Sequence, residues 1–255
     1  MPFTPSHVAA VLPFRAIRVL PFAALAAGSM APDLPYFLPG VRFLGGATHT
    51  VVGTVSLDVV IGVALWAMWR SIAAPLHDLS PAVIRERWDP PGWAVARWWG
   101  VPLAAALGAV THVGWDEFTH AGRYATTHLA VLSASYPGPF GPLAGYRYAQ
   151  YLSGAIGLGI IAIAALRRKR TPLPSHEATR LARALPWLCL AAAGVGAGVR
   201  IATAGGFAIA LDALAFAGIT GAIGAGAAAV LAACWWRAVA PRVIGWVRAS
   251  SGTAG

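Results

Sequence analysis

Three side chains that can bind a metal recur at a helical interval within residues 111–120. His112, Asp116 and His120 are each four residues apart. Four residues of an α-helix turn about 400°, so the three side chains lie on one face. The stretch closes the apolar run Val101–Val113, where ionisable groups are costly and are often functional. Because imidazole and carboxylate groups suit zinc, manganese or iron, we interpret this stripe as half of a metal site.

The spacing of the stripe bears on the number of ions. His112 and His120 are about 12 Å apart along a helix axis, so one ion would need both side chains stretched toward each other. Two ions with Asp116 between them fit more easily, since ions in two-metal hydrolytic sites lie about 3.5–4 Å apart, a distance that one carboxylate bridges. Glu117, one position off the stripe, is a candidate for proton transfer. The alternative is that these groups are only solvated at a helix end.

The composition is that of an integral membrane protein. Of the 255 residues, 58% are hydrophobic and 11% are charged, against about 25% charged in an average soluble protein. The net charge of +10 comes from arginines clustered between apolar runs, where positive charge fixes membrane orientation. No Lys/Arg stripe with interleaved aromatic residues is present, so we expect no nucleic-acid partner. The N-terminus lacks a basic region before an apolar core, so we expect no cleaved signal peptide.

Apolar segments predict an all-α, polytopic membrane helix bundle of about five or six spans with short N-terminal helices. A span needs about 20 predominantly apolar residues, and Phe22–Met30 is too short, so a sixth span among residues 8–30 stays open. The five expected spans are Val51–Trp69, Trp93–His120, Tyr148–Leu166, Leu185–Val199 and Phe207–Trp236.

Three regions follow from this pattern. Residues 1–166 form the expected metal-site membrane domain, with the short N-terminal helices and three spans. Residues 167–248 hold two spans rich in Gly and Ala, which are expected to pack closely because small residues let membrane helices approach. Residues 249–255 are rich in Ser, Gly and Ala, and we expect a disordered tail.

Lysine and arginine counts predict the orientation. They alternate as 4, 2, 6, 1 and 3 in residues 70–97, 121–147, 167–184, 200–206 and 237–248. Cytoplasmic loops are the richer ones, which places the C-terminus inside and the residues before the first span outside. The three arginines of residues 1–48 argue weakly against this orientation.

This topology brings two distant stretches to one membrane surface. His49 precedes the first span, and the stripe ends the second, so both lie on the outer side, where His7 and Asp33 can join them. The candidate metal ligands are therefore His7, Asp33, His49, His112, Asp116 and His120.

Further polar residues lie in or beside the spans. Tyr146, Arg147 and Gln150 stand at the outer mouth of the third span, where they either bind an anionic head group of a substrate or only anchor the helix. Asp58 lies within the first span, nine residues after His49. That interval is about 180° around a continuous helix, so we expect Asp58 to face away from His49 and to pair with an arginine or join a polar core.

Four motifs of residues 1–165 resemble a bacterial integral membrane family of unknown function. They are Pro2-Phe3-Thr4-x-Ser6-His7-x-Ala9-Ala10, Gly28-Ser29-Met30-Ala31-Pro32-Asp33-x-Pro35-Tyr36-Phe37, Thr48-His49-Thr50 and His112-x-x-Trp115-Asp116-x-Phe118-Thr119-His120.

The order of these motifs is also similar to two enzyme groups, the membrane-bound metal-dependent hydrolases and the zinc-dependent phospholipase C and nuclease superfamily. The superfamily's all-α site holds up to three zinc ions. The resemblance implies that the six candidates are ligands and that Asp116 bridges. The phospholipases have a further His-x-x-x-Glu and an N-terminal Trp that this chain lacks, so the resemblance implies one or two ions.

Together these features predict a membrane-embedded metal-dependent hydrolase in the bacterial cytoplasmic membrane, with its site on the outer face. Zinc is the expected divalent metal, with magnesium or manganese as alternatives. Asp116 and Glu117 are the expected catalytic residues, and the substrate is a lipid or isoprenoid phosphoester or diphosphate. The alternatives are a magnesium-dependent prenyl-diphosphate transferase or cyclase and a non-enzymatic metal-ion carrier or lipid-binding membrane protein. The oligomeric state is left open.

Overall fold

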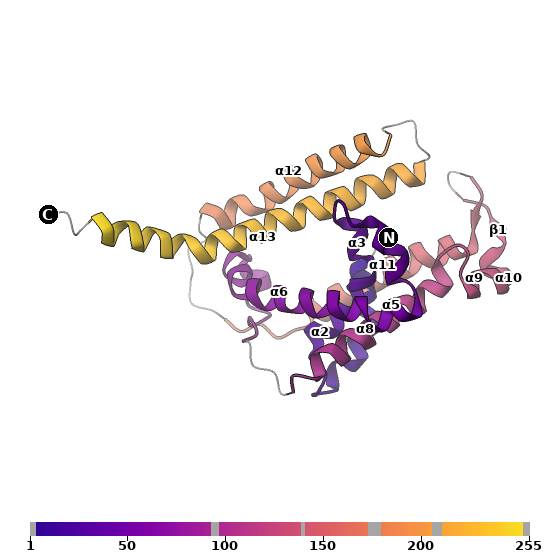
Figure 1. The fold of residues 1–255 in the computed structure, drawn as a ribbon, viewed down its shortest axis with the longest axis horizontal. Coiled ribbons are helices and arrows are strands. Elements are labelled where there is room, and N and C mark those ends of the chain that lie inside the picture. Colours follow the sequence, from indigo (N-terminus) through magenta and orange to yellow (C-terminus); the bar gives the residue numbers. More distant parts are fainter. Residues whose placement is uncertain (1–3, 93–96, 139–140, 173–179, 206–210, 252–255) are drawn as a thin grey trace. The chain divides into compact units, whose positions relative to one another are not determined.

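The computed structural model describes residues 4–92, 97–138, 141–172, 180–205 and 211–251, and these residues are almost wholly helical (Figure 1). The elements, in order, are η1 (Thr4–His7), α1 (Val8–Val11), η2 (Leu12–Ala16), α2 (Phe22–Met30), η3 (Ala31–Asp33), α3 (Leu34–Phe37), η4 (Arg42–Leu44), α4 (Gly45–Thr48), α5 (Val51–Val55), α6 (Leu57–Leu79), α7 (Ala82–Arg85), α8 (Gly100–Thr119), α9 (Tyr124–His128), α10 (Ala130–Ser133), β1 (Ser135–Tyr136), β2 (Leu143–Ala144), α11 (Gly145–Leu166), α12 (Arg180–Thr203) and α13 (Leu211–Ser251).

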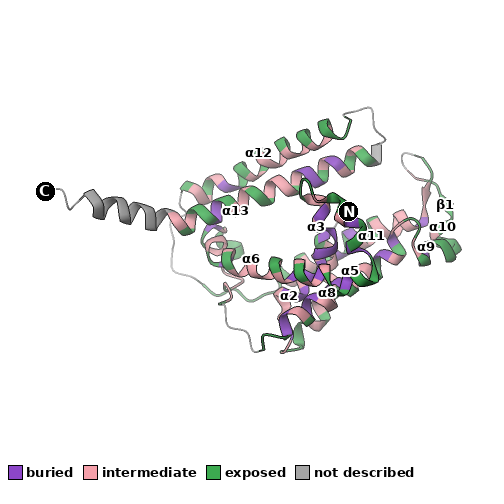
Figure 2. Cartoon of the chain, in the orientation of Figure 1, coloured by how far each residue is buried: buried purple, intermediate pink, exposed green. Residues whose placement is uncertain are grey.

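Four helices of the described residues are long and apolar enough to cross a membrane: Val51–Leu79, Gly145–Leu166, Arg180–Thr203 and Ala213–Val239. The predicted all-α polytopic membrane fold is confirmed. Large apolar side chains face outward on these helices, as lipid contact requires. Val51 is 83% exposed and Trp187 is 73% exposed, and Figure 2 shows exposed residues along α12.

The second expected span, Trp93–His120, differs from the other four. Its described part, α8, is helical as predicted but is not among the helices apolar enough to cross a membrane. Its last two turns carry His112, Asp116 and Glu117, which lower its mean hydropathy. Nine of the 20 residues of α8 are buried, while Leu103 and Val110 are about half exposed. Residues 93–96 lie outside the described residues.

The chain divides into two compact units, one of Met1–Ala67 with Ala94–Arg167 and one of Met68–Trp93 with Arg168–Gly255. The first unit ends at Arg167, next to residue 166, where the metal-site domain was expected to end. Residues 68–93, however, belong to the second unit. The first span also runs further than predicted, through Pro75 to Leu79. Helix α13 continues to Ser251, three residues into the expected tail, and residues 252–255 lie outside the described residues.

Small residues allow three helices of the first unit to cross closely. A Cβ on Gly28 of α2 would collide with the Ala105 carbonyl oxygen of α8, and one on Gly108 would lie 2.6 Å from the Ser29 amide nitrogen. On α6, a Cβ on Gly62 would lie 3.1 Å from the Gly28 Cα. Glycine at these positions is therefore what permits the backbones to approach.

The second unit is held by α12, α13 and the end of α6. Its buried cluster comprises Leu79, Leu185, Ala233 and Cys234. Arg237 of α13 pairs with Asp78 of α6 at 3.1 Å. Helices α12 and α13 run side by side (Figure 1). A Cβ on Gly196 of α12 would lie 2.3 Å from the Gly221 carbonyl oxygen and 2.4 Å from the Ala225 Cβ of α13, so glycine permits their close approach.

Candidate metal centre

Short elements of the N-terminal region present three of the candidate ligands to α8. His7 ends η1, Asp33 ends η3 and His49 follows α4. These elements are short because Pro5, Pro32 and nearby glycines interrupt helices. His112 and Asp116 lie on one face of α8, and His120 is its C-terminal capping residue.

The structure brings Asp33, His49, His112 and Asp116 together in a buried cluster. The Nε2 atom of His49 is 3.5 Å from Asp33 Oδ1 and 3.3 Å from Asp116 Oδ2. The Nε2 atom of His112 is 3.6 Å and 3.4 Å from the same two oxygens. Ligand atoms that surround one tetrahedral zinc at about 2.0–2.1 Å are about 3.4 Å apart. These nitrogen–oxygen separations therefore fit the sharing of a cation.

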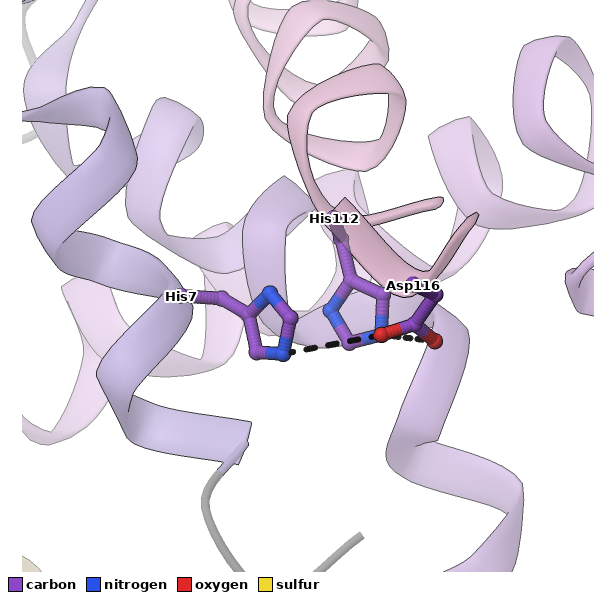
Figure 3. Close-up of side chains that lie close together, drawn as sticks. All are labelled: His7, His112 and Asp116. Carbon is purple, nitrogen blue, oxygen red and sulfur yellow. Dashed lines mark ion pairs between the residues drawn. The ribbon is translucent and has the colours of Figure 1, made fainter. Parts of the chain in front are cut away.

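The other oxygen of Asp116 is reached by His7 and His120. His120 Nδ1 lies 3.2 Å and His7 Nε2 lies 4.0 Å from Asp116 Oδ1. Figure 3 shows His7 and His112 beside this carboxylate, and their rings stack with centroids 3.8 Å apart. The ligand atoms form two sets of three within 4.8 Å, Asp33–His49–His112 and His7–His112–Asp116. Asp116 thus has one oxygen on each side, as a bridging carboxylate requires.

Four polar atoms of this cluster are buried without a hydrogen-bond partner among the described residues. They are Asp33 Oδ1, His112 Nε2 and both carboxylate oxygens of Asp116. Each buried polar atom left unpaired costs about 1–3 kcal/mol. A cation beside Asp33 Oδ1, His112 Nε2 and Asp116 Oδ2 would satisfy three of them, and Asp116 Oδ1 faces the second set of ligand atoms. The orphaned atoms therefore fit a divalent metal.

Contacts behind the ligands fix their orientation. His112 Nδ1 donates to the Ser29 carbonyl at 2.7 Å, and His49 Nδ1 donates to the Gly45 carbonyl at 2.8 Å. A carbonyl only accepts, so Nδ1 of each ring carries a proton and Nε2 is the nitrogen that faces the carboxylates. The Thr4 hydroxyl donates to Asp33 Oδ2 at 2.5 Å. Metal-binding histidines and carboxylates are typically held in this way.

Residue type and spacing alone do not single out these anchoring residues. Thr4 and Ser29 lie within the quoted motifs, which was the available signal. Gly45 acts through its backbone carbonyl, which no residue type reveals.

Three ionisable candidate ligands lie outside the membrane-spanning helices, and their surroundings shift their pKa values. Burial lowers the pKa of His7 to about 4, and the neighbouring His112 acts in the same direction. Burial also acts to lower the pKa of His49, but the carboxylates Asp116 and Asp33 outweigh it and raise this pKa to about 9. For Asp33, burial acts to raise the pKa, but His112 and His49 hold it well below its usual range. The site therefore keeps a carboxylate charge for a cation.

The predicted second catalytic residue, Glu117, is not brought into the cluster. Its carboxylate lies 3.6 Å from Arg123 Nη1 and accepts from the Tyr124 amide at 2.9 Å. One step along a helix turns a side chain by about 100°, and here that step directs Glu117 to the start of α9. Arg123 also donates to the His49 carbonyl at 3.1 Å, so Glu117 helps to hold the loop that borders the site.

Of the predicted substrate-binding residues, Gln150 contacts a candidate ligand. Its Nε2 atom lies 3.0 Å from His120 Nε2. Tyr146 and Arg147 lie one turn earlier on α11, where the guanidinium is 6.0 Å from the tyrosine ring centroid. Gln150 is thus a positioning contact for His120.

A family model described as a domain of unknown function (DUF4184) matches residues 1–240. The match extends beyond the N-terminal motifs, over α12 and most of α13. No curated protein and no solved structure matches the chain. The comparisons therefore assign a family without an activity.

Proposed function

The chain belongs to the DUF4184 family, and from its site we propose that it is a membrane-embedded, metal-dependent hydrolase of lipid or isoprenoid phosphoesters or diphosphates. The observation that carries the proposal is that buried ligand atoms of Asp33, His112 and Asp116 have no hydrogen-bond partner among the described residues, although His112 Nε2 lies only 3.6 Å from Asp33 Oδ1 and 3.4 Å from Asp116 Oδ2. Residues far apart in the chain have no other evident reason to orient these atoms inward.

The donor set favours zinc. Histidine nitrogens from up to four side chains combine with two carboxylates at this centre, and imidazole suits zinc, whereas magnesium prefers oxygen ligands. A magnesium-dependent prenyl-diphosphate enzyme is expected to present more carboxylates and fewer histidines. We propose one or two zinc ions, with Asp116 shared between them where two are bound.

The chemistry divides between the ion and the chain. Asp33, His49, His112 and Asp116 would hold a divalent ion, which would supply Lewis acidity toward a water and a phosphoryl group. Asp33, His49 and His112 form the enclosed side, because their side chains are 7% exposed or less. His120, with a side chain 24% exposed, forms the open side, and Gln150 orients it. A substrate would therefore approach over His120.

Apolar side chains beside the open side support a lipid-like substrate. Trp115 and Phe118 flank Asp116 on α8 and are 46% and 42% exposed. Trp115 also donates to the Ser153 hydroxyl of α11 at 3.1 Å, which fixes its ring. Exposed aromatic residues of this kind favour the membrane–water interface, so a phosphate carried by a lipid tail would meet the site at the correct depth.

The ends of the helices support a common membrane surface for the site. His49 precedes α5 and α6, His120 ends α8, and Gln150 lies near the start of α11. These three residues are linked through Asp116 and His120, so α8 runs antiparallel to both neighbouring spans. We propose that α8 returns the chain across the bilayer and that the site faces outward in the cytoplasmic membrane, following the arginine counts.

The test is hydrolysis by purified protein in mixed micelles. Zinc-loaded protein is incubated with a phospholipid and with an isoprenyl diphosphate, and release of phosphate or head group is measured. We expect zinc-dependent release that is abolished by a chelator and by Asp116→Asn and is unchanged by Asp78→Asn. Zinc-loaded protein that releases nothing from either class would contradict the proposal.

A further inference from the structure

Asp58 is a buried acid that the proposed site does not use. It lies on α6, within the membrane-crossing segment Val51–Leu79. Its side chain is wholly buried, and neither carboxyl oxygen has a hydrogen-bond partner among the described residues. An acid buried in a membrane helix without a partner is destabilising and usually functional.

The helix around Asp58 directs it toward the interior of the first unit. Ser56, with φ −124° and ψ −78°, separates α5 from α6, so the continuous helix assumed from the sequence is interrupted, and Asp58 does not face away from the site. Gly62 is one turn later on the same face and packs against Gly28 and Ala105. Asp58 therefore points into the interface of α6 with α2 and α8.

The direction of the three helices places Asp58 on the ligand side of this crossing. From Gly62, α6 runs back along the chain toward His49. From the same crossing, α2 runs forward to Asp33 and α8 runs forward to His112. Asp58 lies one turn along this direction. It is thus between the small-residue crossing and the metal ligands.

Asp58 lies behind the cluster without joining its ligand sets. It is buried one helical turn from Gly62, which packs on α2 and α8. Its oxygens belong to neither set of ligand atoms within 4.8 Å. Its effect on a cation is therefore exerted through the low-dielectric interior, where charges interact more strongly than in water.

We propose that Asp58 supplies a third negative charge that allows the centre to hold two divalent ions. Asp33 and Asp116 carry two negative charges, which neutralise one divalent ion when the histidines are neutral. A second ion leaves two uncompensated positive charges in a buried site. Asp58 offsets one of them without binding either ion. This inference rests on the metal centre of the proposed function and not on hydrolysis.

The experiment is zinc titration of purified full-length protein by calorimetry in detergent. Wild type is expected to bind two ions per chain. Asp58→Asn and Asp58→Leu both remove the charge, and we expect them to keep the first ion and to weaken the second by about 10–100-fold, the range seen when groups behind metal ligands are removed. Asp78→Asn is the matched control, since Asp78 lies on the same helix and pairs with Arg237; it should leave both affinities unchanged.

A second readout is the thermal stability of the metal-free variants. Removing an uncompensated buried acid should maintain or raise it, because the acid serves the metal and not the fold. Unchanged affinity for the second ion in a folded variant would overturn the inference, as would failure of both variants to fold or a wild type that binds one ion. A wild type that binds none would instead overturn the proposed metal centre itself.

Discussion

Asp116 is the residue through which both groups of candidate ligands are connected. Its Oδ2 lies beside His49 and His112, whereas its Oδ1 lies beside His120 and, further off, His7. Neither oxygen has a well-aligned hydrogen bond among the described residues. A carboxylate in this position could serve an ion on either side under the proposed function, so its loss should affect the whole centre and not one ligand position.

Thr4 provides a residue-scale test of the contacts behind the ligands. Thr4→Val removes the hydroxyl that donates to Asp33 Oδ2 while keeping the shape of the side chain. We expect zinc affinity to fall by about 10–100-fold, measured by competition with a chelating dye. Thr127→Val is the control, because among the described residues that hydroxyl bonds to Arg123, Tyr124 and His128 of its own segment. Equal affinities in the two variants would show that Thr4 does not orient Asp33.

At the residue scale, the sequence predicted the candidate ligands better than it predicted the groups that orient them. His112, Asp116 and His120 were predictable because a helical interval of four fixes a common face. Glu117 was expected to be catalytic, but its direction depends on Arg123 and on the start of α9, which no local spacing reveals. The Ser29 and Gly45 carbonyls were not predictable for the same reason, since every residue has one.

At the scale of elements, glycine determines how α2, α6 and α8 meet. Gly108 faces the backbone of α2, whereas Gly114, on the same helix, has nothing within 4 Å of where a Cβ would lie. The two positions therefore separate the effect of close packing from that of helix propensity.

Alanine at each position makes opposite predictions. Gly108→Ala should destabilise the protein by about 1–3 kcal/mol, because the added methyl overpacks a backbone contact. Gly114→Ala should be neutral or stabilise by up to about 1 kcal/mol, since alanine favours a helix interior over glycine. Thermal unfolding in detergent, followed by circular dichroism, measures both. A Gly108→Ala protein as stable as wild type would contradict the close crossing.

The elements themselves were predicted unevenly. The apolar runs and prolines of the sequence predicted a long helix at α8 and a short helix at α2. The break at Ser56 was not predictable, because Val51–Trp69 reads as one continuous apolar run. A continuous helix would direct Asp58 away from His49, whereas the break at Ser56 allows it to point into the helix interface.

At the scale of the whole molecule, hydropathy predicted the membrane class, and four apolar helices confirm it. The extent of the compact units was less predictable. Residues 70–92 are polar and Pro-rich, which favours a loop, whereas α6 continues to Leu79 and Asp78 pairs with Arg237. Long-range contacts of this kind leave no local pattern.

The proposed orientation can be tested with single cysteines. Cys189 and Cys234 are replaced by alanine, and a cysteine is introduced by Tyr124→Cys, beside the site, or by Arg168→Cys, after α11. Both positions are exposed. In intact cells a membrane-impermeant thiol reagent should label the first variant and not the second, because arginine-rich loops stay in the cytoplasm. Labelling of the second variant alone would reverse the proposed orientation.

The metal content of the purified protein tests the central claim most directly. Elemental analysis is applied to wild type, to Asp116→Ala and to Asp78→Asn, all checked for folding by circular dichroism. We predict that wild type and Asp78→Asn carry one or two zinc ions per chain and that Asp116→Ala carries only background metal. A folded Asp116→Ala protein with the metal content of wild type, or a wild type that takes up no metal, would contradict the account.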